Sequence, residues 1–182
     1  VRVTGTKIHF YNPRHPIPYS EIDYGEKLLW AKPIESDVII AYKIGDHCSM
    51  HRRRLDASTK WILTHPCDDK IIVADDDRSL TLNGTRLELP NKLRCAGVET
   101  DSVLVIVYTD AAIQGRNAYR YNRDGTLKWQ IGERRFDADV PFTNMGWVRE
   151  GTLKAEGFTE NRATGAIVDY ETGEIVERED PR

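Results

Sequence analysis

Histidine and cysteine side chains gather in one stretch of the chain, and they are the residue types best suited to hold a metal ion. Cys48 and His51 lie close together, and His65 and Cys67 form a second close pair further along. Zinc takes four nitrogen or sulfur ligands in a tetrahedron, usually in pairs close in sequence. The sequence therefore allows a zinc site at these four residues. Its chemistry would be that of a metal-dependent enzyme or a small-molecule binder using residues 47–67.

The spacing of these residues also argues against a metal. It matches no standard zinc finger. Alternation along a strand turns His65 and Cys67 to one face but separates Cys48 from His51. Histidines in loops and small buried cysteines are the alternative interpretation. We therefore expect no cofactor, and zinc is the one cofactor that these side chains could hold.

Hairpins must position these side chains, and the clearest hairpin lies downstream at Asn117–Ile131. Tyr119 and Tyr121 alternate with small or polar residues, which is the period of a strand with one buried face. Asp124-Gly125 is a turn signal, because glycine accepts a positive φ without steric cost. The outgoing strand carries an apolar stripe that we expect to be buried: Leu127, Trp129 and Ile131.

Parts of this hairpin recur upstream, which predicts an internal duplication. Three blocks match in the same order: Val1–Phe10 with Leu80–Leu89, Ile34–Tyr42 with Val98–Tyr108, and Asp56–Leu63 with Asp124–Ile131. The last pair keeps an Asp, a Lys and a Trp in register. The matches imply a period of roughly 65 to 80 residues, and self-similarity of this kind is the first signal to look for in a sequence. The alternative is that any two β-hairpins look alike. The predicted repeat units are residues 1–78 and 79–182, packed as one domain.

Short strands with turn signals follow one another along most of the chain. One stretch is ambiguous, because Ser20–Asp23 resembles a capping box that could open a short helix through Trp30, whereas Lys27–Ala31 could equally be a strand. About fourteen strands without a clear helix favour a sandwich, barrel or propeller. We predict an all-β, antiparallel fold, β-propeller-like with an internal duplication and incomplete or open, with a β-sandwich as the alternative.

Composition bounds the class of protein. The chain has 182 residues and a formal charge of −3, and this near-neutral balance argues against a nucleic-acid-binding surface. No apolar run approaches the roughly 18 residues that suggest a membrane span. The N-terminus reads as neither a signal peptide nor a transit sequence, and a trimmed mature end with secretion is the alternative. Three cysteines leave an odd thiol, which favours a reducing compartment and therefore the cytoplasm.

Two hairpins resemble those of a known class. Tyr119–Trp129 and Val168–Ile175 resemble blade hairpins of quinoprotein-like (PQQ-repeat) β-propellers, which carry an aromatic, an Asp, a Gly and a Trp. The block Leu80–Glu177 resembles small uncharacterised bacterial proteins with the same order of hairpins. The resemblance implies a fold rather than an activity, and the chain shows no residue set for a quinone. A blade takes about 40 residues, so the chain holds at most four.

These patterns favour a non-enzymatic protein-binding module of bacterial origin. The specific hypothesis is an immunity or adaptor protein that occludes a protein partner such as a toxin, because the repeat scaffold is strong and the sequence shows no catalytic constellation. Loops at Tyr11–Tyr19 and Asp110–Arg116 are expected to bind. Of the four tryptophans, Trp147 is expected to be an exposed anchor and the others core residues. The predicted binding residues are Trp147, Tyr11, Tyr19 and Arg116. Open sheet edges also allow a homo-oligomer.

Overall fold

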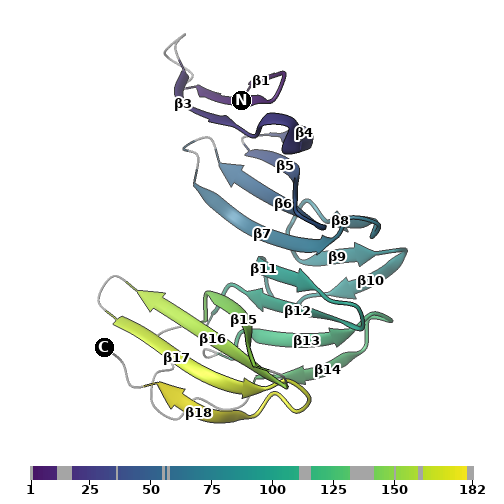
Figure 1. Ribbon diagram of the computed structural model, residues 1–182, viewed down its shortest axis with the longest axis vertical. Helices are drawn as coiled ribbons and strands as arrows, with labels where there is room; N and C mark the ends of the chain where they lie inside the picture. Colours follow the sequence, from purple (N-terminus) through teal and green to yellow (C-terminus); the bar gives the residue numbers. More distant parts are fainter. Residues whose placement is uncertain are drawn as a thin grey trace. The chain divides into compact units, whose positions relative to one another are not determined.

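The computed structural model describes residues 2–11, 18–35, 37–54, 56, 58–110, 116–131, 142–149, 151–159 and 162–179. Within these residues the regular elements are β-strands and one short 3-10 helix. The chain divides into two compact units, Val1–Asp69 and Lys70–Arg182 (Figure 1). Each unit consists of antiparallel meanders of three or four strands, the kind of sheet that forms a propeller blade. The all-β, antiparallel, propeller-like fold class predicted from the sequence is confirmed.

The first unit holds two meanders. Its strands are β1 (Arg2–Thr4), β2 (Lys7–Tyr11), β3 (Pro18–Asp23), β4 (Leu28–Ile34), β5 (Asp37–Ile44), β6 (His47–Arg54) and β7 (Thr59–Pro66). Strands β1–β3 form one sheet, and β4–β7 lie side by side in chain order in the next. Strand β4 lies at the end of the strand order and pairs with β5.

The core of the first unit lies between these two meanders. Ile8 and Phe10 of β2 alternate with polar residues and are fully buried. Val38 and Ile40 of β5 are also fully buried and belong to the same apolar cluster. The sheet β1–β3 therefore covers one face of β4 and β5.

The stretch after Ser20 forms no α-helix. Strand β3 runs to Asp23, the 3-10 helix η1 spans only Gly25–Lys27, and β4 begins at once. The Asp23 carboxylate accepts the N–H of Gly25 at 2.9 Å and the Thr6 hydroxyl at 2.7 Å. Gly25 has φ +57°, which does not fit within an α-helix. The helix suggested by the capping box is therefore wrong, and the strand alternative is correct. No helix among the described residues is long and apolar enough to span a membrane.

The second unit holds three meanders. Its strands are β8 (Ile71–Val73), β9 (Ser79–Leu82), β10 (Thr85–Glu88), β11 (Leu93–Val98), β12 (Ser102–Val107), β13 (Ala118–Asn122), β14 (Leu127–Gln130), β15 (Asn144–Arg149), β16 (Thr152–Thr159), β17 (Arg162–Asp169) and β18 (Ile175–Glu179). They pair in chain order as β8–β10, β11–β14 and β15–β18. The repeat units predicted from the sequence, residues 1–78 and 79–182, describe an internal duplication rather than compact units, and they stay a prediction.

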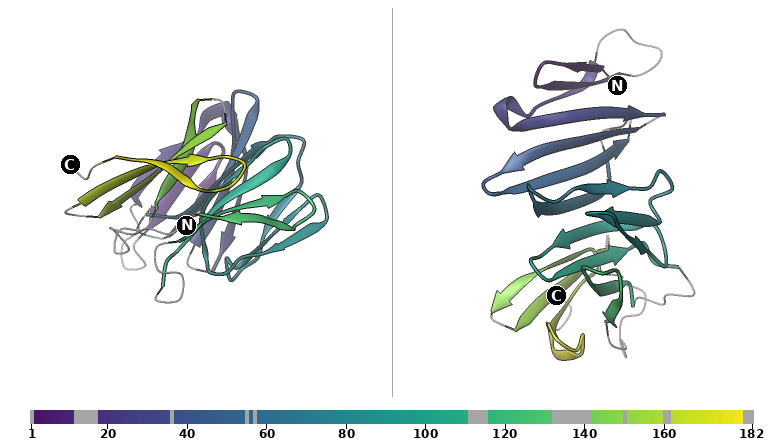
Figure 2. Two further views of the ribbon diagram at one scale, coloured as in Figure 1. Left: turned by 90° about the horizontal axis from the view of Figure 1, so that it is seen from below. Right: turned by 90° about the vertical axis from the view of Figure 1, so that its right-hand side faces the viewer.

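One apolar core cluster of the second unit lies between the last two meanders. In Figures 1 and 2 the yellow strands form a layer of their own beside the green strands. Buried side chains from both layers belong to one cluster: Leu104, Ile106, Ala118, Trp129, Ile131, Phe142, Leu153, Ala155, Ala166, Val168 and Tyr170. The face of β11–β14 that carries these residues is therefore covered by β15–β18.

The predicted hairpin at Asn117–Ile131 forms as β13 and β14. The prediction that its whole apolar stripe is buried is wrong at one residue. Trp129 and Ile131 are buried, whereas Leu127 is 53% exposed. A register shift between Arg120 and Tyr121 places Leu127 beside the turn, where the sheet ends. The face of β13 expected to be polar is buried as well, because Arg120 is only 1% exposed.

Candidate functional site

The predicted zinc ligands do not converge. Cys48 and Cys67 form a disulfide with Cα atoms 4.9 Å apart. Antiparallel pairing of β6 and β7 sets His65 directly opposite Cys48, which brings Cys67 close to Cys48. His51 lies on the other face of β6, as alternation requires. Among the described residues no group of three or more metal-binding side chains is placed to hold an ion. Since a disulfide offers no thiolate, the zinc hypothesis applies to the reduced chain alone.

His51 lies in a buried polar cluster instead. Its Nε2 atom lies 2.8 Å from the Tyr42 hydroxyl and 3.1 Å from the Ser49 hydroxyl. The Tyr42 and Tyr24 rings pack with their centroids 4.9 Å apart. Burial, and then the nearby charge of Arg53, lowers the pKa of His51 to about 4. The imidazole is therefore neutral at pH 7. Ser49 is only 2% exposed, so this cluster is built as packing rather than as a nucleophile site.

The structure disperses the four predicted binding residues. Tyr11 ends β2 and is half-buried, and Arg116 donates to the Ile131 carbonyl oxygen at 3.1 Å. Tyr19 and Trp147 lie in β3 and β15, and their side chains are outside the described residues. Most of the two predicted binding loops, residues 12–17 and 111–115, also lies outside the described residues. The binding role of these residues stays a prediction.

A tryptophan that the sequence places in the core is exposed. Trp61 and Trp129 are buried as expected, but Trp30 is 43% exposed and its neighbour Leu29 is 52% exposed. Both lie on β4, whose burial pattern is mostly exposed or intermediate. The sequence does carry a signal for an outer strand here, since Pro33 lacks an N–H and proline is confined to sheet edges. The core expectation for Trp30 is therefore wrong.

Two lysines flank Trp30 on one sheet face. Trp30 pairs with Ala41 of β5, and Lys32 pairs with Ile39, so alternation puts Lys32 and Lys43 on the face that carries Trp30. Both lysines are exposed, and no ion pair within the described residues engages either. Ala41, the residue of β5 that pairs with Trp30, is buried. We name Leu29, Trp30, Lys32 and Lys43 the β4 patch.

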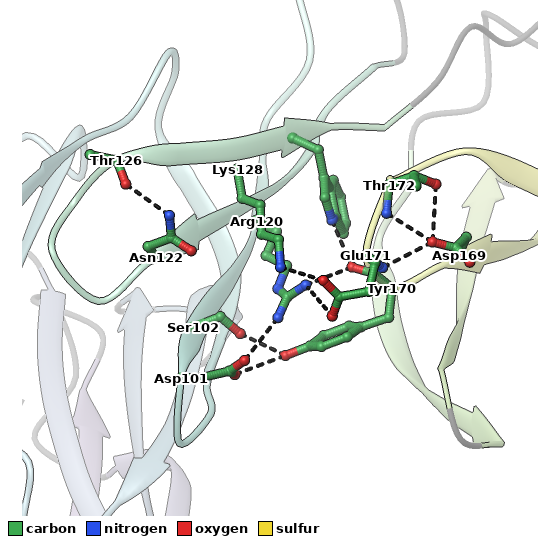
Figure 3. A network of polar contacts seen from close by, with 11 residues as sticks. Asp101, Ser102, Arg120, Asn122, Thr126, Lys128, Asp169, Tyr170, Glu171 and Thr172 are labelled. Atoms are coloured by element: carbon green, nitrogen blue, oxygen red, sulfur yellow. Dashed lines mark hydrogen bonds and ion pairs between the residues drawn. The ribbon is translucent and has the colours of Figure 1, made fainter.

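A polar network of the second unit surrounds Arg120 (Figure 3). The Arg120 guanidinium donates to Asp101 at 3.0 Å, to Glu171 at 3.1 Å and to the Tyr170 carbonyl oxygen at 2.8 Å. It also stacks on the Tyr170 ring, 3.4 Å from the centroid. Lys128 forms a second ion pair with the Glu171 carboxylate. The network therefore connects β13 and β14 to the hairpin between β17 and β18.

The carboxylates of this network are exposed although Arg120 is buried. Burial alone would raise the pKa of Asp101, but hydrogen bonds from Ser102 and Tyr170 and the charge of Arg120 hold it below its ordinary value. Hydrogen bonds from Lys128 and then Arg120 lower the pKa of Glu171. Both acids are therefore ionised near neutral pH and neutralise the buried arginine. This arrangement joins the buried arginine to two ionised carboxylates and stabilises the fold.

The first unit repeats this arrangement at the matching positions. Buried Arg52 donates to Asp37 at 2.8 Å, and Lys60 donates to the same carboxylate at 2.6 Å. Arg52 pairs with Trp61 across the ladder, as Arg120 pairs with Trp129. Arg52 therefore neutralises a buried acid, Asp37. Neither buried arginine carries a signal in the sequence, because both alternate with residues of the other face like ordinary polar strand residues.

The matching family covers more than half of the chain. A family model described as a domain of unknown function, DUF7957, matches residues 71–180. The chain belongs to this family. The matched residues include the whole Arg120 network and both meanders that share the main apolar cluster. No curated protein matches the chain.

Solved structures show weak likenesses. A Bacteroides caccae protein of unknown function is 8% identical with a TM-score of 0.43, and the match covers 89% of this chain and 70% of that one. Hsv2 of Kluyvelomyces marxianus is 10% identical with a TM-score of 0.47, covering 96% and 61%. BamB of Moraxella catarrhalis is 17% identical with a TM-score of 0.39, covering 82% and 47%. The chain thus spans less than two thirds of the last two proteins. TM-scores below 0.5 say nothing of what this chain binds.

Proposed function

We propose that this chain is a non-enzymatic protein-binding module. The observation that carries the proposal is the exposure of Leu29 and Trp30 side by side on an outer strand. Tryptophan is enriched among residues that dominate binding energy at protein interfaces. The apolar surface of an exposed tryptophan next to an exposed leucine leaves contact with water only when a partner covers it. The β4 patch is therefore the proposed contact surface.

The position of the β4 patch on an outer strand supports a protein as the partner. An outer strand presents backbone N–H and C=O groups that another chain can pair with. Strand addition of this kind gives affinity through the backbone and specificity through side chains. Two flanking lysines are fewer than a nucleic-acid-binding surface normally carries, so the proposal excludes nucleic acid as the partner.

The finer parts of the proposal concern the identity of the partner and the setting. We assign the chain to bacteria and to the immunity or adaptor class, in which it occludes a partner such as a toxin by surface complementarity. The likeness of its hairpins to PQQ-repeat blades belongs to the same proposal. The cytoplasmic location is proposed too, although the disulfide between Cys48 and Cys67 would suit an oxidising compartment better. Fractionation of the host cells decides between the cytoplasm and an oxidising compartment.

The test is affinity capture of the tagged chain from its native host, with mass spectrometry of the retained material. The proposal expects one protein partner in a stoichiometric amount. Candidate toxins among the retained proteins are then assayed with and without the chain, and loss of toxicity supports the immunity assignment. A chain that carries bound zinc and no partner would overturn the proposal and return attention to residues 47–67.

A further inference from the structure

The second unit contains a covered counterpart of the exposed site at Trp30. On β11, Cys95 follows a register shift after Leu93 and pairs with Ile106 of β12. On β4, Trp30 follows a register shift after Leu28 and pairs with Ala41 of β5. Trp30 and Cys95 therefore occupy the same place in two meanders of the same build.

A chain segment lies over Cys95. The Cys95 thiol donates to the Thr143 carbonyl oxygen at 3.7 Å, and the neighbouring Phe142 is fully buried. Asn117 fixes this segment by donating to the Phe142 carbonyl oxygen at 2.8 Å and accepting its N–H at 3.0 Å. The segment then enters β15. The counterpart position at Trp30 stays 43% exposed.

The charges at the β4 patch specify the chemistry of what would cover it. Lys32 and Lys43 flank Trp30 on one face and have no ion-pair partner within the described residues. At the covered site, Gly97 and Tyr108 occupy the places that correspond to these two lysines by register. The two additional lysines of the β4 patch favour a partner that carries carboxylates, because a positively charged or uncharged partner would leave both lysines without an opposite charge.

We infer that the β4 patch binds an extended, acidic segment of a partner protein, with an apolar side chain on Trp30 and carboxylates on Lys32 and Lys43. The segment adds to β4 as a further strand, because β4 pairs with β5 and lies at the end of the order. Pro33 has no N–H to donate, so the added strand pairs with the stretch before Pro33. This inference rests on the proposed function and names the partner's chemistry.

The test measures peptide binding by fluorescence anisotropy. The probes are a labelled peptide of repeating Glu-Thr-Val-Thr units, which sets glutamate and valine alternately on one face of a strand, and a matched peptide with lysine in place of glutamate. We expect the acidic peptide to bind the wild type, and the double variant K32E/K43E to bind it at least ~10-fold more weakly. The lysine peptide should instead prefer the double variant. Lys92→Glu, an exposed lysine of the second unit, is the control and should leave binding unchanged.

Several results would overturn the inference. Equal binding of both peptides by the wild type, or an unchanged affinity in K32E/K43E, would remove the role of charge. Tighter binding of a single-stranded oligonucleotide at the same lysines would assign the patch to nucleic acid. Self-association that Lys32→Glu abolishes and Glu177→Lys then restores would assign it to β18 of a second copy, whose exposed Glu177 lies on an outer strand. Binding of a captured partner that depends on Trp30 but not on the lysines would leave the proposed function intact.

Discussion

Gly173 lies directly against the indole of Trp129. A Cβ atom on Gly173 would come within 2.7 Å of the ring atom Cδ2, and the indole Nε1 donates to the Tyr170 carbonyl oxygen at 2.8 Å. The hairpin that carries Trp129 and the turn that carries Gly173 are therefore the two sides of one contact. Their spacing reflects packing between two sheets rather than a binding site.

Gly173→Ala should destabilise the protein by about 2–4 kcal/mol. The position has φ +75°, which costs an L-residue about 1 kcal/mol, and the added methyl group must push the Trp129 ring out of a packed core, which costs a further 1–3 kcal/mol. Urea unfolding followed by circular dichroism measures the change.

The chain offers a matched control for this variant. Gly151 also has φ +75°, but a Cβ atom there would meet nothing within 4 Å. Gly151→Ala should therefore cost only the backbone term of about 1 kcal/mol. Equal losses in the two variants would show that the contact between Gly173 and Trp129 does not matter.

Arg120→Met should destabilise the protein by about 2–3 kcal/mol. The variant loses the bonds to Tyr170, Asp101 and Glu171 and the stacking on the Tyr170 ring. The loss stays below that of a fully buried ion pair, because both carboxylates are exposed and regain water. Arg86→Met, which breaks the exposed pair with Glu88, should cost at most about 0.5 kcal/mol. Equal losses of unfolding free energy in the two variants would show that the Arg120 network stabilises the protein no more than an exposed ion pair does.

The fold could be predicted from the sequence because its signals are local. Alternating residues and turn pairs such as Asp124-Gly125 and Asn83-Gly84 mark hairpins, and the structure places a hairpin at each. The duplication signal also pointed to Trp61 and Trp129 as core residues, and both are buried. The hairpin signals depend on residues a few positions apart, and the duplication signal on comparing two stretches of one chain, so a single sequence shows both directly.

The parts that could not be predicted depend on contacts between distant residues. Arg120 looked solvent-facing, because its partners Tyr170 and Glu171 lie about fifty positions away and are adjacent only in the folded chain. Trp30 looked like core, because alternation shows which residues share a face but not whether anything covers that face. The zinc hypothesis likewise could not show that pairing of β6 with β7 brings the sulfurs of Cys48 and Cys67 together.

Stability should fall as the pH drops from about 6.5 to about 4, owing to His51. Its pKa in the folded chain is about 4, below the ordinary 6.5 of an exposed histidine, so the unfolded chain takes up the proton first and acid favours unfolding. The loss between pH 7 and pH 5 should be about 2 kcal/mol. In His51→Gln this part of the pH slope should vanish, whereas the exposed control His47→Gln should keep it. A slope unchanged in His51→Gln would refute this origin.

Reduction of the disulfide should lower stability by about 3 kcal/mol, because it releases a loop of sequence separation 19 in the unfolded chain. Urea midpoints with and without reductant measure the loss, and Cys48→Ser/Cys67→Ser should reproduce it. Cys95→Ser should keep the response to reductant, since Cys95 is a free thiol. Zinc should not bind the oxidised chain, whose two candidate sulfur ligands are bonded to each other. Stoichiometric zinc uptake by the oxidised chain would contradict this assignment.

The affinity of the captured partner for the wild type and for Trp30→Ala tests the central claim most directly. Isothermal titration should show binding to Trp30→Ala that is about 100-fold weaker, the size expected for an aromatic anchor. Ile72→Ala removes an even more exposed apolar side chain, 68% exposed on β8, and should bind as the wild type does. Equal affinity of all three proteins would contradict the claim that the β4 patch is the contact surface.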